Sequence, residues 1–164
     1  MKFAKKIFMV LITILPVLLV SCSKDSTTSP IDTGSYSLSC VVNGGGYTNQ
    51  TFAFSLTAAA VTNPQEGIIG CTFTDNEGNS AVIVFSGTTT GTYTVGETGD
   101  NGLSIAMENN LFLGITSGSI IVTKVGSVGG DIIGTFSGEG IVIDNSVPQV
   151  IQITNGKFKA KRLT

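Results

Sequence analysis

Residues 69–85 read IGCTFTDNEGNSAVIVF, and this stretch decides the fold class. Ile69, Cys71 and Phe73 alternate with small or polar residues, as in a strand with one buried face. The segment from residue 75 to 79 consists of turn-forming residues. Residues 81–85 are apolar throughout, which is typical of a central strand. The stretch therefore predicts a strand, a turn and a second strand.

Similar short runs of Val, Ile, Thr, Phe and Tyr, separated by Gly and Asn, continue along the chain after residue 34. No apolar stripe at helical spacing interrupts them. We expect a single all-β domain of about ten strands, folded as an antiparallel β-sandwich or a flattened barrel. The expected strands lie near residues 36–42, 52–56, 69–73, 81–85, 93–95, 103–107, 120–122, 132–136, 141–143, 150–154 and 157–162.

Two short segments qualify this pattern. The three alanines within Leu56–Val61 favour a helical turn as an alternative to a strand there. Asn155-Gly156 predicts a hairpin turn between the last two strands, because both residues tolerate positive φ. Lys157–Arg162 would then form a solvated edge strand, since lysines discourage pairing with other chains. The alternative for this basic cluster is contact with anionic headgroups or lipopolysaccharide.

The N-terminal residues have the order of a secretory signal. Lys2, Lys5 and Lys6 precede an apolar run of about 14 residues that ends at Val20. A helix that spans a bilayer needs about 20 residues, so this run suits a cleaved signal peptide over residues 1–21. An uncleaved signal anchor and an ordinary secretory peptide are the alternatives.

The residues Leu19-Val20-Ser21-Cys22 resemble the lipobox of bacterial lipoproteins. The resemblance implies cleavage before Cys22, a diacylglycerol on its sulfur and a fatty acid such as palmitate on its amine, which together anchor a protein firmly in a membrane. Ser23 follows, and under the sorting rule of enteric lipoproteins it implies the outer membrane of a Gram-negative bacterium. Residues 22–34 are rich in Ser, Thr and Asp and predict a flexible tether. Residues 35–164 form the expected β domain, which faces either the periplasm or the cell surface.

Four segments carry a second resemblance. The sequences at 91–95, 119–124, 133–137 and 153–158 resemble the C-terminal half of uncharacterised small β-rich lipoproteins from Bacteroidetes-type bacteria. This resemblance implies a β fold and an envelope location. It implies no activity and no catalytic residues.

Composition restricts the function classes. The mature chain would carry six basic and eleven acidic residues, a formal net charge of −5, so nucleic acid is not an expected partner. The chain has no His and no Trp, which removes the usual catalytic base, the commonest zinc ligand and the strongest platform for stacking sugars. Tyr36, Tyr47 and Tyr93 remain as weaker sugar-stacking candidates.

Cys40 and Cys71 both fall on the apolar faces of predicted strands. In an exported protein, such a pair forms a disulfide if the two strands are neighbours. Two buried free thiols are the alternative. Catalysis by either cysteine is not expected, because no histidine is present to lower its pKa.

Asp75, Glu77 and Asn79 alternate like the oxygen ligands of a calcium loop, but calcium needs six to eight oxygens, so we interpret them as a solvated turn and expect no cofactor. The cluster Glu97, Asp100 and Asn101 is interpreted in the same way. Most other acids also adjoin Gly or Asn in expected turns, which argues against a paired-carboxylate hydrolase. The acids considered in this way are Glu66, Asp75, Glu77, Asp100, Glu108, Asp131, Glu139 and Asp144.

Three functional hypotheses follow. The first is a non-enzymatic binding module tethered to the outer membrane, with a glycan or an envelope protein as its partner. Its sugar-binding version expects Tyr47 or Tyr93 to be exposed on a concave surface. The second is a structural envelope lipoprotein that assembles with itself or another surface protein through an exposed apolar patch or an unprotected strand edge. The third, a hydrolase, requires two acids that converge in a cleft.

Overall fold

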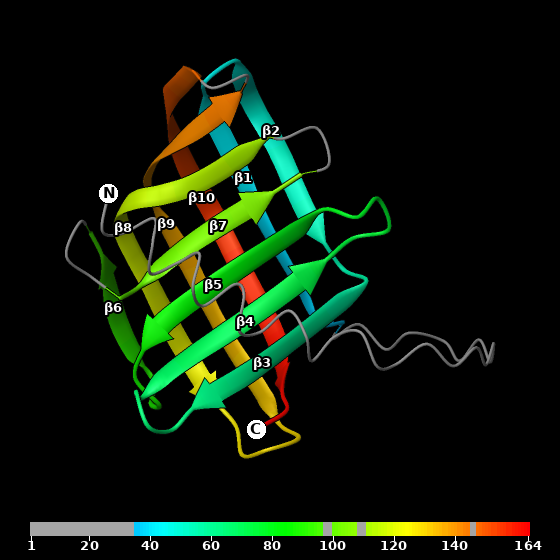
Figure 1. Ribbon diagram of the computed structural model, residues 1–164, viewed down its shortest axis with the longest axis vertical. Helices are drawn as coiled ribbons and strands as arrows, with labels where there is room; N and C mark the ends of the chain where they lie inside the picture. The colour runs from blue at the N-terminus through cyan, green and yellow to red at the C-terminus, as the bar shows by residue number, and fades with distance from the viewer. Residues whose placement is uncertain (1–34, 97–99, 108–110, 145–146) are drawn as a thin grey trace. The chain divides into compact units, whose positions relative to one another are not determined.

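The computed structural model describes residues 35–96, 100–107, 111–144 and 147–164 (Figure 1). The signal-peptide and lipobox predictions for residues 1–22, and the tether up to residue 34, lie outside these described residues. Gly34–Thr164 form one compact unit. Its described part has no helix long and apolar enough to cross a membrane. The strands are β1 (Ser37–Gly44), β2 (Tyr47–Phe54), β3 (Thr57–Asn63), β4 (Ile68–Thr74), β5 (Ser80–Ser86), β6 (Gly91–Val95), β7 (Gly102–Ala106), β8 (Phe112–Val125), β9 (Asp131–Asp144) and β10 (Val147–Arg162).

Seven of the ten strands close into a ring in the order β3-β4-β5-β7-β8-β9-β10. β1 and β3 pair with successive parts of one edge of β10, and β7 and β6 do the same along one edge of β8. β2 extends the sheet beyond β1. The pairings between the described strands are antiparallel except for the short parallel contact between β10 and β3. The predicted all-β fold is therefore confirmed, as a flattened barrel.

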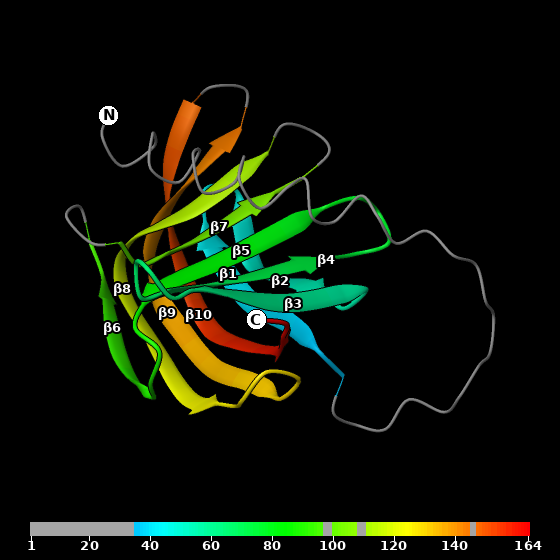
Figure 2. The same cartoon turned by 60° about the horizontal axis from the view of Figure 1, so that its bottom comes forward.

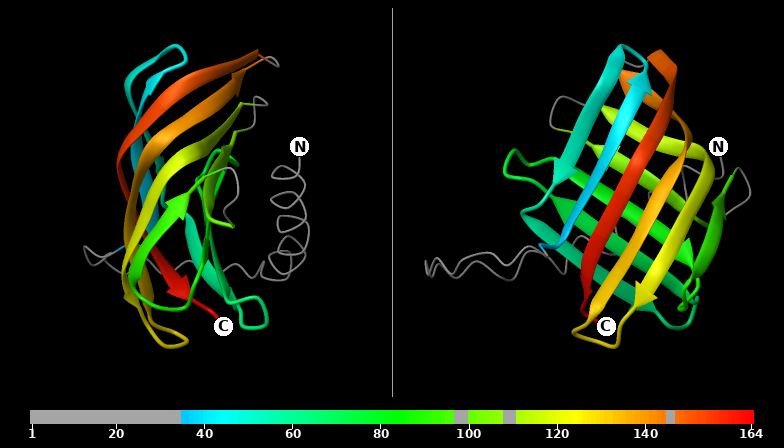
Figure 3. Two further views of the ribbon diagram at one scale, coloured as in Figure 1. Left: turned by 90° about the vertical axis from the view of Figure 1, so that its left-hand side faces the viewer. Right: turned by 180° about the vertical axis from the view of Figure 1, so that it is seen from behind.

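The barrel has two layers (Figure 2). The short-strand sheet consists of β3, β4, β5 and β7, and the long-strand sheet consists of β2, β1, β10, β9, β8 and β6 in that spatial order (Figure 3, right). β8 and β9 have 14 residues each and β10 has 16, so these three strands extend past the core at one end. We call the solvent-facing side of the long-strand sheet its outer face.

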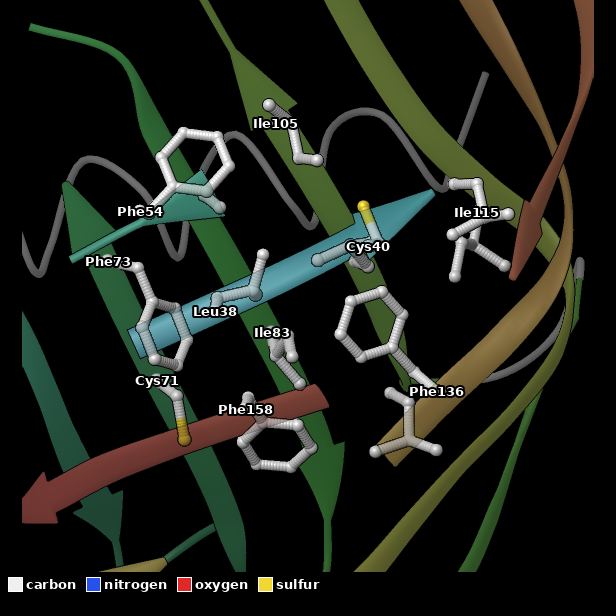
Figure 4. Close-up of a cluster of buried hydrophobic side chains, with 14 of the residues drawn as sticks. Leu38, Cys40, Phe54, Cys71, Phe73, Ile83, Ile105, Ile115, Phe136 and Phe158 are labelled. Carbon is white, nitrogen blue, oxygen red and sulfur yellow. The ribbon is translucent and has the colours of Figure 1, made fainter. Parts of the chain in front are cut away.

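Side chains from both sheets fill the space between the layers (Figure 4). The alternation predicted from the sequence places Leu38 and Cys40 of β1 inward, facing Cys71 and Phe73 of β4. The Phe73 ring packs edge-on against Phe158, with ring centroids 6.5 Å apart, and the Phe136 ring packs tilted against Phe158 at 6.4 Å. The largest fully buried side chains are Phe54, Phe73, Phe85, Leu38, Ile69, Ile83, Ile105, Leu113, Ile120, Ile132, Ile151 and Ile153.

The long strands curve, so that the outer face is convex (Figure 3, left). Register shifts interrupt the β8–β9 ladder at Thr116 and at Thr123, and each threonine hydroxyl donates a hydrogen bond to a β9 carbonyl, that of Glu139 or Ile133. Bulges of this kind bend a strand and increase its local twist. Between them Gly118 and Gly138 lie opposite each other, and a Cβ on either glycine would overlap the backbone of the other strand. The curvature therefore depends on these small residues.

The possibility of a helical turn over Leu56–Val61 is wrong. Thr57–Asn63 form β3, which pairs residue by residue with β4 from Thr57 opposite Thr74 to Asn63 opposite Ile68. Ala58 and Ala60 point into the core. Small side chains suit this place because β3 lies where the ring closes against β10, and this tertiary contact overrides the helix preference of alanine.

The predicted hairpin turn at Asn155-Gly156 is also wrong. β10 continues through these residues, and Asn155, with φ of 53°, forms a bulge in which β10 has one residue more than each neighbouring strand. Gly156 lies against the carbonyl and ring of Phe136, where a Cβ has no room. The properties that make Asn-Gly a good turn, positive φ and small size, serve a bulge equally well.

The edge-strand interpretation of Lys157–Arg162 is also wrong, because β10 is not an edge strand. β10 pairs with β9 on one side and with β1 and then β3 on the other. Lys157, Lys159 and Lys161 alternate outward while Phe158 and Ala160 point into the core. These lysines therefore do not protect an edge, and their presence on the outer face needs another explanation.

Candidate functional site

The β10 bulge opens a shallow hollow of about 340 Å³ on the outer face, between β1, β2 and β10. Ser39, Val41, Thr51, Asn155 and Lys157 line it together with Cys40. The hollow arises because the β1–β10 ladder is interrupted between Ser39 and Val41, opposite the extra residue of β10. Its hydroxyl, amide and ammonium groups are hydrogen-bond donors, which suit a polar or anionic ligand group.

A polar cluster lies beside the hollow, toward the end of β10. The Tyr36 hydroxyl donates a hydrogen bond to Oδ1 of Asp131 at 3.1 Å. Lys124 Nζ and Lys159 Nζ lie 3.3 and 3.7 Å from Oδ2 of the same carboxylate. Lys159 Nζ is also 5.2 Å from the centre of the Tyr36 ring. The cluster joins the residue before β1 to β8, β9 and β10.

This arrangement shifts two pKa values in opposite directions. Loss of water raises the pKa of Asp131, but the hydrogen bonds from Lys124 and Tyr36 and the charges of Lys159 and Lys124 outweigh it and hold the pKa below its usual range. Loss of water, the hydrogen bond to Asp131 and the Asp131 charge raise the pKa of Tyr36. At neutral pH the carboxylate is therefore charged and the phenol is neutral, so the cluster orients β1 against β9 and β10.

The five basic side chains of the described residues all lie at this end of the long-strand sheet, and we call them the basic end. They are Lys124, Lys157, Lys159, Lys161 and Arg162. Among the described acidic side chains, only Asp131 and Glu139 lie on the strands of this sheet, whereas Glu66, Asp75, Glu77 and Asp100 lie in connections that begin or end at the short-strand sheet. In the described part of this acidic chain, the basic side chains are thus gathered at one end of the long-strand sheet.

The opposite end of the outer face is apolar. Its rows are Phe112–Ile143–Pro148 and Gly114–Ile141–Val150, each running across β8, β9 and β10. We call the five side chains Phe112, Ile141, Ile143, Pro148 and Val150 the apolar patch. Val150 is 69% exposed and Phe112 is 36% exposed. Leu113, Val142 and Ile151 alternate with them and are buried, which places the patch on the outer side.

The patch has a polar border toward the middle of the sheet. Gln152 donates a hydrogen bond to Glu139 Oε1 at 2.8 Å, in the row that continues to Asn43 of β1. Beyond β1, β2 is an edge strand of eight residues, and neither β2 nor the other edge strand, β6, contains a charged residue or a proline. An apolar patch with a polar border and an edge without charge are both features of protein-binding surfaces.

The two cysteines of the described residues are free and buried. β1 and β4 belong to different sheets, and Figure 4 shows the thiols of Cys40 and Cys71 apart from each other. Burial raises the pKa of Cys40 to about 12 and raises that of Cys71 as well. Of the two alternatives, the structure contains the buried free thiols, which act as small apolar side chains and are protonated at neutral pH.

Asp75, Glu77 and Asn79 form the β4–β5 turn, as the solvated-turn interpretation expects. Asp75 Oδ1 accepts hydrogen bonds from the backbone NH groups of Glu77 and Asn79, and Oδ2 accepts one from the Asn79 side chain at 2.7 Å. Desolvation raises the pKa of Asp75, but these hydrogen bonds outweigh it and lower the pKa. Both carboxylate oxygens are used within the turn. No group of three or more metal-binding acids, cysteines or histidines occurs among the described residues.

Asn101 of the second candidate cluster has a structural role that the sequence did not indicate. Its side-chain oxygen accepts hydrogen bonds from the backbone NH and hydroxyl of Ser86, at 2.7 and 3.1 Å, and its amide donates to the Thr94 carbonyl at 2.8 Å. The buried Asn101 thus ties the ends of β5 and β6 to the start of β7. Asp100 is exposed, and Glu97 lies outside the described residues.

The sugar-stacking tyrosines are only half-exposed. Tyr93 packs on Phe85 with ring centroids 5.0 Å apart and donates a hydrogen bond to the Thr89 carbonyl at 2.6 Å. Tyr47 packs edge-on against Phe52 at 5.5 Å. Both rings are partly buried against the core, so neither is fully exposed as the sugar-binding version expects.

The prediction that Glu139 lies in a turn is wrong, because this residue lies within β9. Asp131, which was also expected in a turn, is the first residue of that strand. Glu108 lies outside the described residues, as does the side chain of Asp144.

No family model, curated protein or solved structure matches this chain.

Proposed function

We propose that the chain is a lipid-anchored outer-membrane lipoprotein whose β domain is a non-enzymatic interaction module, and that its partner is another protein of the cell envelope. The apolar patch is the observation that carries this proposal. It extends across three neighbouring strands, and its five side chains contribute nothing to the core that the rest of the barrel encloses.

The state of the candidate reactive side chains supports binding over catalysis. The buried thiols are protonated, the Asp75 carboxylate is engaged within its own turn, and Asp131 is paired with two lysines. Two carboxylates that share a cleft would be needed for hydrolysis of a sugar bond. Asp131 and Glu139 instead lie eight residues apart along β9, about 26 Å at the rise of an extended strand, and on a convex face.

The partner is inferred from the chemistry of the patch. A face of valine, isoleucine, proline and phenylalanine with a glutamine–glutamate border resembles the centre and rim of a protein interface. The alternative structural hypothesis, assembly of the protein with its own copies, uses the same surface.

Site-specific photocrosslinking of the full-length protein in its source bacterium tests the proposal. A photoreactive residue at Val150 should give a covalent adduct, whereas the same residue at Thr92, exposed on the outer face of β6, should not. An adduct of twice the protomer mass would identify a second copy, and a different mass would identify another envelope protein. The absence of an adduct at Val150, or equal adducts at both positions, would contradict the proposal.

The anchor is tested separately. Labelled palmitate should be incorporated into the wild-type protein and not into Cys22→Ser, and only the wild type should remain in the membrane pellet after a high-salt wash. Labelling of the Cys22→Ser variant would contradict the assignment of this residue.

A further inference from the structure

We infer that the basic end is a second binding surface, and that it contacts the anionic headgroups of the membrane that holds the lipid anchor. This inference deepens the proposed function, because it gives the anchored domain an orientation. It rests on four observations: the position of the charges, the exposed apolar side chains beside them, the place where the chain enters the domain, and the curvature of the sheet.

The charges are concentrated on a short part of β10. Lys157, Lys159 and Lys161 project from alternate positions of one strand, so their Cα atoms follow at intervals of about 6.7 Å. Lys157 and Lys161 are exposed, and Lys124 of β8 adds a side chain that is 55% exposed. Because β10 is paired on both sides, protection of an edge does not account for this row. Four lysines on the outer face, with Asp131 as the acidic side chain described among them, give this end a net positive charge that attracts an anionic surface.

Two exposed apolar side chains lie at the same end. Val128, 63% exposed, is in the β8–β9 connection, and Leu163, 47% exposed, follows the last residue of β10. The connection is fixed to β10, because Gly129 donates a hydrogen bond to the Arg162 carbonyl at 2.8 Å and Arg162 Nη1 donates to the Gly126 carbonyl at 3.0 Å. Apolar side chains flanked by cations are typical of surfaces that bind at the bilayer interface.

The chain enters the domain at this end. Ser37, the first residue of β1, pairs with Lys159, and Tyr36 immediately before it donates a hydrogen bond to Asp131 of the polar cluster. The segment that connects Cys22 to the domain therefore joins it next to the lysines. An anchor at Cys22 would keep the basic end within one tether length of the bilayer, which raises its effective concentration at the headgroups.

The curvature separates this surface from the apolar patch. Because the outer face is convex, a flat membrane can contact one end of it without contacting the other (Figure 3, left). Contact through the basic end leaves Phe112 and Val150 available to a partner protein. The two surfaces can therefore act at the same time.

Binding of the non-lipidated mature chain to vesicles tests the inference without depending on the anchor. The protein would be residues 22–164 with Cys22→Ser, which retain the whole compact unit, and folding would be verified by circular dichroism. The probes are vesicles of phosphatidylcholine alone or mixed with phosphatidylglycerol, separated by flotation. We expect binding only to the anionic vesicles, with an affinity that falls as salt is added.

Two variants of equal net charge locate the effect. Lys157→Gln with Lys161→Gln should lower the affinity about tenfold or more. Thr48→Glu with Gln50→Glu changes the net charge by the same amount on the exposed part of β2, far from the basic end, and should lower it much less. Val128→Ser should lower the affinity several-fold with no change of charge.

Equal losses in the two charge variants would mean that only net charge matters, and would overturn the inference. Binding to neutral vesicles as strong as to anionic ones would also overturn it, as would no binding to either. Palmitate labelling at Cys22 is a separate measurement, so failure of the anchor and failure of the basic end are distinguishable.

Discussion

Gly156 provides a sharp test of the β10 bulge, on which both the hollow and the outward row of lysines depend. In Gly156→Ala, the new Cβ would meet the Phe136 carbonyl oxygen and two carbons of the Phe136 ring at 2.5 and 2.6 Å. The carbonyl belongs to the adjacent backbone of β9 and the ring is in the core, so neither can move without disturbing its neighbours. Over-packing of this kind costs about 3 kcal/mol.

Chemical denaturation followed by far-ultraviolet circular dichroism measures this loss. A destabilisation of about 3 kcal/mol corresponds to a fall in Tm of about 10 °C for a domain of this size. Gly91→Ala is the matched control, because Gly91 also lies in a strand but has no atom within 4 Å of its added Cβ. Its free energy of unfolding should change by no more than about 0.5 kcal/mol.

Equal unfolding midpoints for Gly156→Ala and Gly91→Ala would refute the reasoning. They would mean that Gly156 does not lie against Phe136, and that β10 is not one continuous strand. A second substitution, Asn155→Val, examines the other half of the bulge. A β-branched residue at φ of 53° should cost about 1–2 kcal/mol, whereas Asn155→Gly should be nearly neutral.

Three further predictions concern the core and the polar cluster. Cys40 and Cys71 should resist Ellman's reagent in the native state and react when the protein is unfolded in urea, because burial raises the pKa of both thiols; rapid native labelling would contradict this. Asn101→Ala should lower the free energy of unfolding, measured in urea, by about 2–3 kcal/mol, because it leaves the Ser86 NH and the Thr94 carbonyl without their hydrogen-bond partner. The control Asn76→Ala, in an exposed turn, should have little effect. Because the pKa of Asp131 is lowered in the folded state, its carboxylate should stabilise the fold at pH values above its unfolded pKa, and this contribution should disappear as the pH falls through the folded pKa. The Tm of Asp131→Asn should therefore fall less with acid than the Tm of the wild type. Identical profiles of Tm against pH would contradict this prediction.

The fold class could be predicted because a strand reveals its buried face by alternation. Leu38, Cys40 and Val42 are buried in β1, as their spacing predicts, and the apolar run at 81–85 is a central strand between β4 and β7. The charge and turn residues at 75–79 likewise predicted the β4–β5 connection. These predictions are local, and local sequence pattern is sufficient for them.

The connectivity of the long strands could not be predicted in the same way. Asn155-Gly156 fits a turn and a bulge equally well, and only the contacts with Phe136 and β1 decide between them. Three alanines favour a helix until β4 pairs along the whole segment and β10 pairs with Ala59 and Ala60. Whether Lys157–Arg162 lies at an edge depends on the position of β1, more than a hundred residues earlier. The candidate surfaces follow from these long-range pairings, so no local motif could have identified them.

The same pairings place the basic end and the apolar patch at opposite ends of the domain. Lys161 and Val150 are eleven residues apart on β10, about 36 Å at the rise of an extended strand, and somewhat less across the curve. The basic end lies where the chain enters from the tether, and the apolar patch lies at the far end of the same three strands. If the basic end rests on the headgroups, the patch is held beyond them, at a height set by the length of β10. A partner protein could then be bound at a fixed distance from the membrane whatever the conformation of residues 22–34, and shortening that segment should leave partner crosslinking at Val150 unchanged.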